Sequence, residues 1–224
     1  MKESSKKKSA EKISLFHGSG NGIHGIIAPI SRGRCDFGAG FYMAPSALHP
    51  LRLVCSGDSP VLYEVELDTK GLNVLELKPD LTWALVIAFN RGKLEPYRDF
   101  PVYTAFQALL AEIDLIRGVI ADDQAFVLLD RFFQGEITDQ ALIHCLSRLD
   151  LGIQYAAVSE KACRQITITS ARTIAKEERE QLKTLSEQNR QAGIDLVKTI
   201  SREYRRKGRF FDEIVEDWNG FEMA

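Results

Sequence analysis

Two short segments decide the fold of this chain: FHGS at Phe16–Ser19 and DFGAGFYMAPS at Asp36–Ser46. In the first segment, a β-rich run that starts at Ile13 ends in a histidine, and a glycine follows at once. In the second segment, glycines frame an aromatic strand that carries Tyr42. Glycine lets a ligand approach the backbone closely, and aromatic rings offer a flat surface with a polar tip. Together the two segments predict a cleft that grips a flat heteroaromatic group.

The HGS and FGAGFYMAPSA segments resemble the first two signature segments of the diphtheria-toxin-like ADP-ribosyltransferases, which include the poly(ADP-ribose) polymerases. The resemblance is greatest to a bacterial branch classed as a domain of unknown function (family 3990), which carries a DFG-x-GFY segment. The resemblance implies NAD as the substrate and a macromolecular acceptor, protein or nucleic acid, that receives one ADP-ribose unit. For the bacterial branch it also implies a toxin-like or defence role, with a neutralising partner.

Size and composition limit the functional classes. A chain of 224 residues is expected to form one domain with an appendage. Its apolar fraction of 45% is that of a soluble globular protein, and no apolar run approaches the ~20 residues that span a bilayer. A net charge of -2 argues against broad, sequence-independent binding of nucleic acid. The four cysteines lack CxxC spacing, which is typical of reduced thiols. We therefore expect a cytoplasmic protein without a membrane span or a metal.

The hydrophobic pattern predicts short strands interleaved with helices in no regular βαβ rhythm, which indicates an α+β fold. The expected strands are residues 13–17, 40–43, 60–68, 72–77, 114–121, 152–159 and 165–169, and the expected helices are residues 46–55, 79–90, 103–112, 122–133 and 138–149. We expect helix 79–90 to be amphipathic, with one apolar side. The resemblance further implies a split β-sheet core of the ADP-ribosyltransferase type with flanking helices.

The ends of the chain differ from this core in composition. Residues 1–12 are predicted to be a disordered basic lead, residues 13–169 the ADP-ribosyltransferase-like domain, and residues 170–224 a helical C-terminal extension. We expect the apolar cluster of this extension to dock on the body of the same chain, and a partner-binding helix is the alternative. The cluster consists of Phe210, Phe211, Ile214, Val215 and Trp218.

A second motif, Gly20–Gly25, matches the dinucleotide-binding pattern GxGxxG. Such a motif must open a helix whose N-terminus receives the pyrophosphate, with an acidic residue about 20 positions further on. Here an extended segment with a proline follows, Ile26–Ile30, and no acid lies at that distance. We therefore reject a Rossmann fold.

The resemblance implies a role for each residue of the first two segments. His17 would hold a ribose hydroxyl through one ring nitrogen, and the main chain of Gly18 would pair with the nicotinamide carboxamide. Ser19 would complete this end of the NAD site. Tyr42 would stack on the nicotinamide ring. The alternatives are a strand-end histidine and a core aromatic residue without a ligand.

Two further residues are assigned to NAD binding. Ser46 would offer a hydroxyl to the carboxamide, although a helix N-cap is an equal alternative and the two roles are compatible. Arg34, or its neighbour Arg32, would meet the diphosphate by bidentate hydrogen bonds. The alternative for both arginines is an exposed position in a loop.

The third signature segment of the family carries a glutamate at the start of a late strand, and the matching residue here is Gln154, in IQYAAV. An amide oxygen accepts a hydrogen bond from a ribose hydroxyl, but it brings no negative charge to the developing cation. The resemblance therefore implies transfer of a single ADP-ribose unit, or slow hydrolysis of NAD, with His17, Tyr42 and Gln154 as catalytic residues. Because glutamate would supply the charge at nearly the same shape, we expect Gln154→Glu to keep or raise NAD cleavage.

Two other functions remain open. The first is a catalytically inactive module that binds NAD or ADP-ribose, which Gln154 favours. The second is an interaction protein that acts through its C-terminal helices. Release of nicotinamide would separate the enzyme from the module, and deletion of the chain after Ser170 would separate the interaction protein from both.

Overall fold

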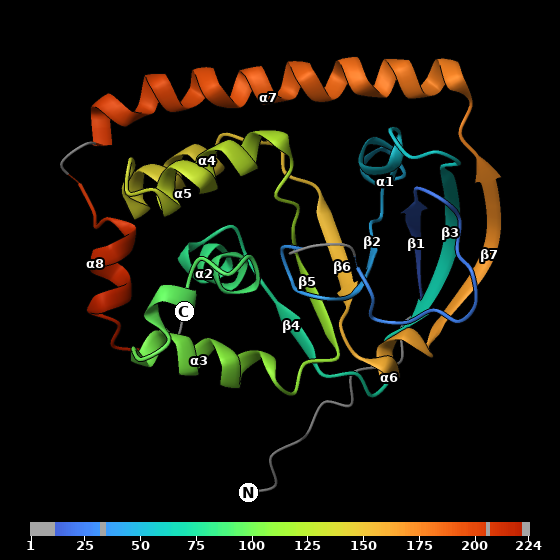
Figure 1. Cartoon of the computed structure of the whole chain (residues 1–224), viewed down its shortest axis with the longest axis horizontal. Helices are drawn as coiled ribbons and strands as arrows, with labels where there is room; N and C mark the ends of the chain where they lie inside the picture. The colour runs from blue at the N-terminus through green and yellow to red at the C-terminus, as the bar shows by residue number, and fades with distance from the viewer. Residues whose placement is uncertain (1–11, 32–34, 205–206, 221–224) are drawn as a thin grey trace, which may run out of the picture.

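The strands form two sheets. The structure is a computed structural model that describes residues 12–31, 35–204 and 207–220. The strands are β1 (Lys12–Ser19), β2 (Phe41–Met43), β3 (Val61–Asp68), β4 (Val74–Glu76), β5 (Leu115–Val119), β6 (Ile153–Ala157) and β7 (Ile166–Thr173). An antiparallel sheet has the order β1-β3-β7, and a mixed sheet has the order β2-β6-β5-β4 with β4 and β5 parallel (Figure 1). The predicted α+β class is confirmed.

A bridge between β1 and the residue after β2 brings the two sheets together. The Phe16 amide donates to the Ala44 carbonyl at 2.8 Å, and the Ala44 amide donates to the Phe16 carbonyl at 2.9 Å. This bridge lies next to His17 and Tyr42. The two signature segments are therefore neighbours in space, at the line where the sheets meet.

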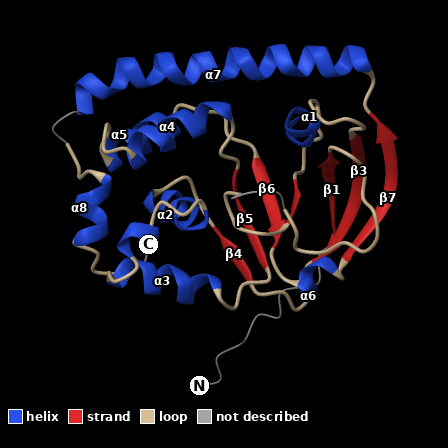
Figure 2. Cartoon of the chain, in the orientation of Figure 1, coloured by secondary structure: helices blue, strands red, loops and turns tan. Residues whose placement is uncertain are grey.

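The helices gather mainly on the larger sheet and along one side of the molecule (Figure 2). They are α1 (Leu48–Val54), α2 (Leu81–Asn90), α3 (Pro101–Leu110), α4 (Asp123–Phe133), α5 (Asp139–Leu146), α6 (Glu160–Cys163), α7 (Lys176–Tyr204) and α8 (Phe211–Glu216). Side chains cap the N-termini of several helices. Asp80 accepts a hydrogen bond from the Trp83 amide at the start of α2, and Thr138 accepts one from the Ala141 amide at the start of α5. Thr138 is the N-cap of α5, at the predicted start of this helix.

Helix α2 differs from the prediction. Its residues from Trp83 to Ala88 are fully buried, so α2 has no polar face and the expected amphipathic helix is wrong. The helix lies among the other helices of the main core, which the larger sheet closes on one side (Figure 1). A helix that is apolar on all sides is typical of such a central position.

The C-terminal part begins where β7 ends. Strand β7 continues to Thr173, past the predicted end at Thr169, because it pairs with β3 as far as Val61. Helix α7 then crosses α1, α4 and α5 along one side of the molecule (Figure 1). At its start, Arg179 donates to the carbonyls of Cys55 at 2.8 Å and Gly57 at 2.6 Å.

Arg52 of α1 joins three helices. Its Nε donates to Ser186 Oγ of α7 at 3.2 Å, and its Nη2 lies 2.7 Å from a carboxylate oxygen of Asp123 in α4. Helix α7 is thus connected to both helices.

The second helix of the extension docks on the body of the chain, as expected. Phe211, Ile214 and Val215 are buried in the main core, and the Phe211 ring packs edge-on against the Phe132 ring at 5.5 Å. Phe210 is different, because it remains 37% exposed and does not join this core. Within the described residues, no helix has both the length and the apolar character that crossing a membrane requires.

The predicted lead falls largely outside the described residues. Residues 1–11 are not among them. Lys12, the last residue of the predicted lead, already belongs to β1 and pairs with Asp68.

Candidate ligand-binding cleft

A cleft of about 930 Å³ is lined by residues from both sheets. Its size lies within the range of small-molecule sites. Its wall comes from the end of β1 and the glycine-rich loop that follows, the connector before β2, α1, the end of α2, the residues after β5, and β6. Five of the predicted site residues line it together: His17, Gly18, Ser19, Tyr42 and Gln154.

His17 is fixed in position and in tautomer. Its Nδ1 lies 2.7 Å from the carbonyl oxygen of Tyr42. Because a carbonyl oxygen can only accept, Nδ1 carries the proton, and Nε2 of the neutral ring is left with a lone pair. Burial lowers the pKa of His17 against the opposing effect of this hydrogen bond, so the ring is neutral near pH 7. The ring also stacks on Phe41 with 3.9 Å between centroids.

Gly18 has a packing role that is independent of any ligand. A Cβ at this position would lie 2.6 Å from the Pro50 carbonyl oxygen and 3.0 Å from Val54 Cγ1. Only glycine therefore lets α1 lie this close to β1, where His49 and Pro50 of α1 form part of the cleft wall.

The loop after β1 is extended and irregular. Ser19 Oγ donates to the Gly22 carbonyl at 2.8 Å, which ties the start of the loop to its middle. Within this described loop, Gly20–Gly25 opens no helix, and Gly22 has a φ of 79° in the left-handed region. The segment thus lacks the helix N-terminus that a Rossmann site needs.

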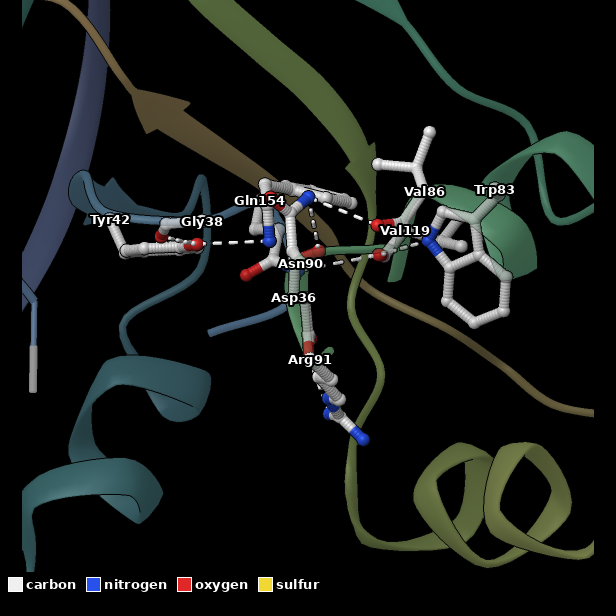
Figure 3. A network of polar contacts seen from close by, with 10 residues as sticks. Asp36, Gly38, Tyr42, Trp83, Val86, Asn90, Arg91, Val119 and Gln154 are labelled. Atoms are coloured by element: carbon white, nitrogen blue, oxygen red, sulfur yellow. Dashed lines mark hydrogen bonds and ion pairs between the residues drawn. The ribbon is translucent and has the colours of Figure 1, made fainter. Parts of the chain in front are cut away.

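Tyr42 is held by its hydroxyl group. The hydroxyl donates to the Gly38 carbonyl at 2.7 Å and accepts from the Phe37 amide at 3.0 Å (Figure 3). Burial raises the pKa of Tyr42, which keeps the hydroxyl protonated as this donor. The ring is therefore a rigid, flat part of the wall.

The segment before Tyr42 is anchored in the core by Phe37. This side chain is 2% exposed, and a Cβ on Gly118 would lie 2.8 Å from its Cζ. Gly118 pairs with Gln154 across β5 and β6, so the missing side chain at Gly118 leaves the space that Phe37 fills.

A polar cluster ties the same segment to the end of α2. Arg91 Nε donates to Asp36 Oδ1 at 3.0 Å, and Arg91 Nη2 contacts the same oxygen. Asn90 Nδ2 donates to the Asp36 carbonyl at 3.2 Å (Figure 3). Asp36 and Arg91 both line the cleft. Neither residue is among those that the sequence predicts for the site, although Asp36 begins the second signature segment.

Gln154 is 5% exposed, lies in β6 and forms part of the cleft wall. Its Nε2 lies 3.5 Å from the Val119 carbonyl oxygen, at the long limit of a hydrogen bond. The same oxygen accepts a hydrogen bond from the buried Trp83 indole at 3.1 Å (Figure 3).

The remaining predicted residues are not brought to the cleft. Ser46 is exposed, its Oγ accepts from the Leu48 amide at 3.3 Å at the start of α1, and it is not among the described residues that line the cleft. Arg34 and its neighbour Arg32 lie outside the described residues.

His49 is a wall residue that the sequence analysis missed. Burial, and then the positive charge of Arg52, lower its pKa to about 4, while Asp123 acts in the opposite direction. An isolated histidine at the start of a helix gives no signal in sequence, because its place in the wall depends on how α1 packs. Within the described part of the chain, no group of three or more His, Cys, Asp or Glu side chains is placed to hold a metal.

Comparison with known proteins gives one family and one weak structural likeness. The model of a family described as "Protein of unknown function (DUF3990)" matches residues 13–168. A chain of the crystal structure of the M. tuberculosis MbcT–MbcA toxin–antitoxin complex aligns with a TM-score of 0.39 and 10% identity, over 78% of this chain and 91% of that one. This likeness is too weak to define a shared fold. No curated protein matches the chain.

Proposed function

Because the chain belongs to the DUF3990 family of proteins of unknown function, we propose its function from the cleft itself. The protein binds NAD there and transfers one ADP-ribose unit to a macromolecular acceptor, with release of nicotinamide. The observation that supports this proposal best is that His17, Tyr42 and Gln154, from three separate parts of the chain, line one cleft. The resemblance of the three segments to ADP-ribosyltransferases assigns the catalytic residues to these positions.

The reaction needs positioning more than acid–base chemistry. The bond between ribose C1′ and the nicotinamide nitrogen breaks, nicotinamide leaves as a neutral molecule, and an oxocarbenium-like ribose cation develops. The Tyr42 ring, held by its hydroxyl, offers a rigid face for the nicotinamide ring. The lone pair on His17 Nε2 accepts a hydrogen bond from a ribose hydroxyl, because Nδ1 already donates to the Tyr42 carbonyl. A fixed substrate lowers the entropic part of the barrier.

The charges in the cleft favour a single transfer and keep a second candidate open. Among the described residues that line the cleft, Asp36 is the carboxylate, and Arg91 neutralises it. Gln154 adds a dipole but no charge. The second candidate is therefore a module that binds NAD or ADP-ribose without turnover. A toxin-like role with a neutralising partner remains part of the proposal for the enzyme.

The test uses two readouts on the purified chain. NAD is expected to raise the melting temperature, because a ligand that binds only the native state stabilises it by about 2.7 kcal/mol at 100 times its Kd. His17→Ala is expected to abolish this rise while the protein stays folded. His144→Ala, which lies in α5 and pairs with Tyr204, is the matched control and should keep the rise.

Release of nicotinamide from NAD, with cell extract as the source of acceptors, then separates the two candidates. Label from NAD in the protein or nucleic-acid fraction supports the transferase and names the acceptor class. A thermal shift without nicotinamide release supports the binding module. Neither a shift nor release at millimolar NAD would exclude both.

A further inference from the structure

The carbonyl oxygen of Val119 contacts two side-chain donors beside the cleft. The Trp83 indole donates to it at 3.1 Å, and Gln154 Nε2 lies at 3.5 Å (Figure 3). Trp83 is fully buried, and the Asp80 carboxylate caps its amide at 3.0 Å, so the indole cannot move away easily. Val119 ends β5 and pairs with Ile153, the neighbour of Gln154. The strand pairing of Val119 and the indole of Trp83 therefore hold this carbonyl in place.

The Val119 carbonyl sets the orientation of the Gln154 amide, with Nε2 and not Oε1 toward it. The opposite orientation would place Oε1 at 3.5 Å from another acceptor oxygen, with little water to screen the repulsion, because Gln154 is 5% exposed. With Nε2 toward Val119, the amide oxygen accepts no hydrogen bond from any of the described residues. This acceptor belongs to a side chain of the cleft wall.

We propose that the Val119 carbonyl turns the Gln154 amide so that its oxygen is offered to a ligand, and that the cleft takes a neutral hydrogen-bond donor there, such as a sugar hydroxyl, and disfavours an ionised carboxylate in place of the amide. The choice of a sugar hydroxyl as the ligand group rests on the proposed function. The exclusion of a carboxylate rests on the protein alone. It reverses the expectation from sequence that Gln154→Glu keeps or raises NAD cleavage at neutral pH.

The exclusion follows from the lone pairs. In the Gln154→Glu variant one carboxylate oxygen would face the Val119 carbonyl in a buried place, and both effects favour the protonated acid. As a neutral acid the introduced group donates to Val119 as the amide does. The variant is then a good mimic of the wild type at low pH and a poor one at neutral pH.

The first experiment needs no ligand. We compare the melting temperatures of wild type, Gln154→Glu and Gln107→Glu between pH 4 and pH 8. Gln107 is exposed on α3 and is the matched control. A carboxyl whose pKa is raised by folding contributes full stability below its unfolded pKa of about 4.3 and loses it as the pH rises through the folded pKa. Gln154→Glu should therefore match wild type near pH 4 and fall behind at higher pH.

The expected fall is roughly 3–5 °C for each unit by which folding raises the pKa of the introduced carboxyl. Gln107→Glu should show no such divergence. If Gln154→Glu follows the wild type at every pH, the carboxyl ionises freely and the proposal is wrong, whatever the protein does with NAD. A variant that folds at pH 4–5 and is unfolded at pH 7 supports it.

Gln154→Met supplies a second arm, because it keeps the length of the side chain without polar atoms. It should differ from the wild type in melting temperature by an amount independent of pH. Its NAD-induced rise should be reduced, with NAD bound about 2- to 13-fold more weakly for the loss of one neutral hydrogen bond. If Gln154→Met keeps the full NAD-induced rise in melting temperature, no ligand group donates a hydrogen bond to Gln154, and this part of the proposal is wrong. A failure of wild type to bind NAD would instead overturn the proposed function and leave the pH result standing.

Discussion

Replacing Tyr42 by phenylalanine tests whether the hydroxyl holds the ring in place. The substitution keeps the aromatic face and removes two hydrogen bonds, one to the Gly38 carbonyl at 2.7 Å and one from the Phe37 amide at 3.0 Å. A buried backbone group that loses its hydrogen-bond partner costs about 1–3 kcal/mol of stability, but solvation of the group from the cleft would reduce this cost. We therefore expect a loss of about 2 kcal/mol, which lowers the melting temperature by roughly 4–8 °C for a chain of this size.

The assay is thermal unfolding with and without NAD, monitored by circular dichroism. Tyr42→Phe should keep a reduced NAD response, because the stacking face remains but is less well ordered, whereas Tyr42→Ala should lose the response. Tyr155→Phe is the control, since its hydroxyl accepts a bond from the partly exposed Arg117 at 3.1 Å and does not line the described cleft. An unchanged melting temperature in Tyr42→Phe would refute the reasoning.

Two further predictions concern stability. Phe211→Ala should lower the free energy of unfolding in urea by about 3–5 kcal/mol, because the ring is 2% exposed among other aromatic rings. Phe210→Ala, at a position that is 37% exposed, should lower it far less. Equal losses in the two variants would contradict docking through α8. The pKa of His49 is lowered to about 4 in the native state, so as the pH falls this histidine is protonated in the unfolded state before it is protonated in the native state. The free energy of unfolding should therefore decrease by about 3 kcal/mol as the pH falls from 6.5 to 4. His49→Asn should flatten this part of the stability curve, and parallel curves for both proteins would show that another group is responsible.

Local patterns predicted most of the elements. The alternation from residue 60 to 68 corresponds to β3, and the predicted helix starts at residues 122 and 138 coincide with the N-caps of α4 and α5, because a cap acts within three residues. The end of β7 could not be predicted, since its last residues are exposed and mainly polar and are held in the strand by main-chain pairing to β3. The burial of α2 on every side also depends on its neighbours in the fold and not on its own sequence.

The candidate site divides in the same way. His17, Gly18 and Tyr42 were identified because each lies in a compact motif. Arg91 lies 55 residues from its partner Asp36, and Trp83 reaches the Val119 carbonyl over 36 residues, so neither contact leaves a local signal. Gly18 shows a different limit: its sequence suggests room for a ligand, whereas the structure shows that α1 already fills the space on its Cβ side.

Helix α7 lies outside the family match, which ends at residue 168. It is nevertheless hydrogen-bonded to α1 and in contact with α4. Residues of α1 form one part of the cleft wall, and Ile120 and Ala121, just before α4, form another. A fragment restricted to the matched region would keep every described residue that lines the cleft and would lose the helix that contacts both α1 and α4. The Arg52–Asp123 pair would still join α1 to α4 in such a fragment, so binding measured on it would test how far α7 contributes to the shape of the cleft. Substitutions in α7 would test the same contribution in the whole chain without altering any described residue that lines the cleft.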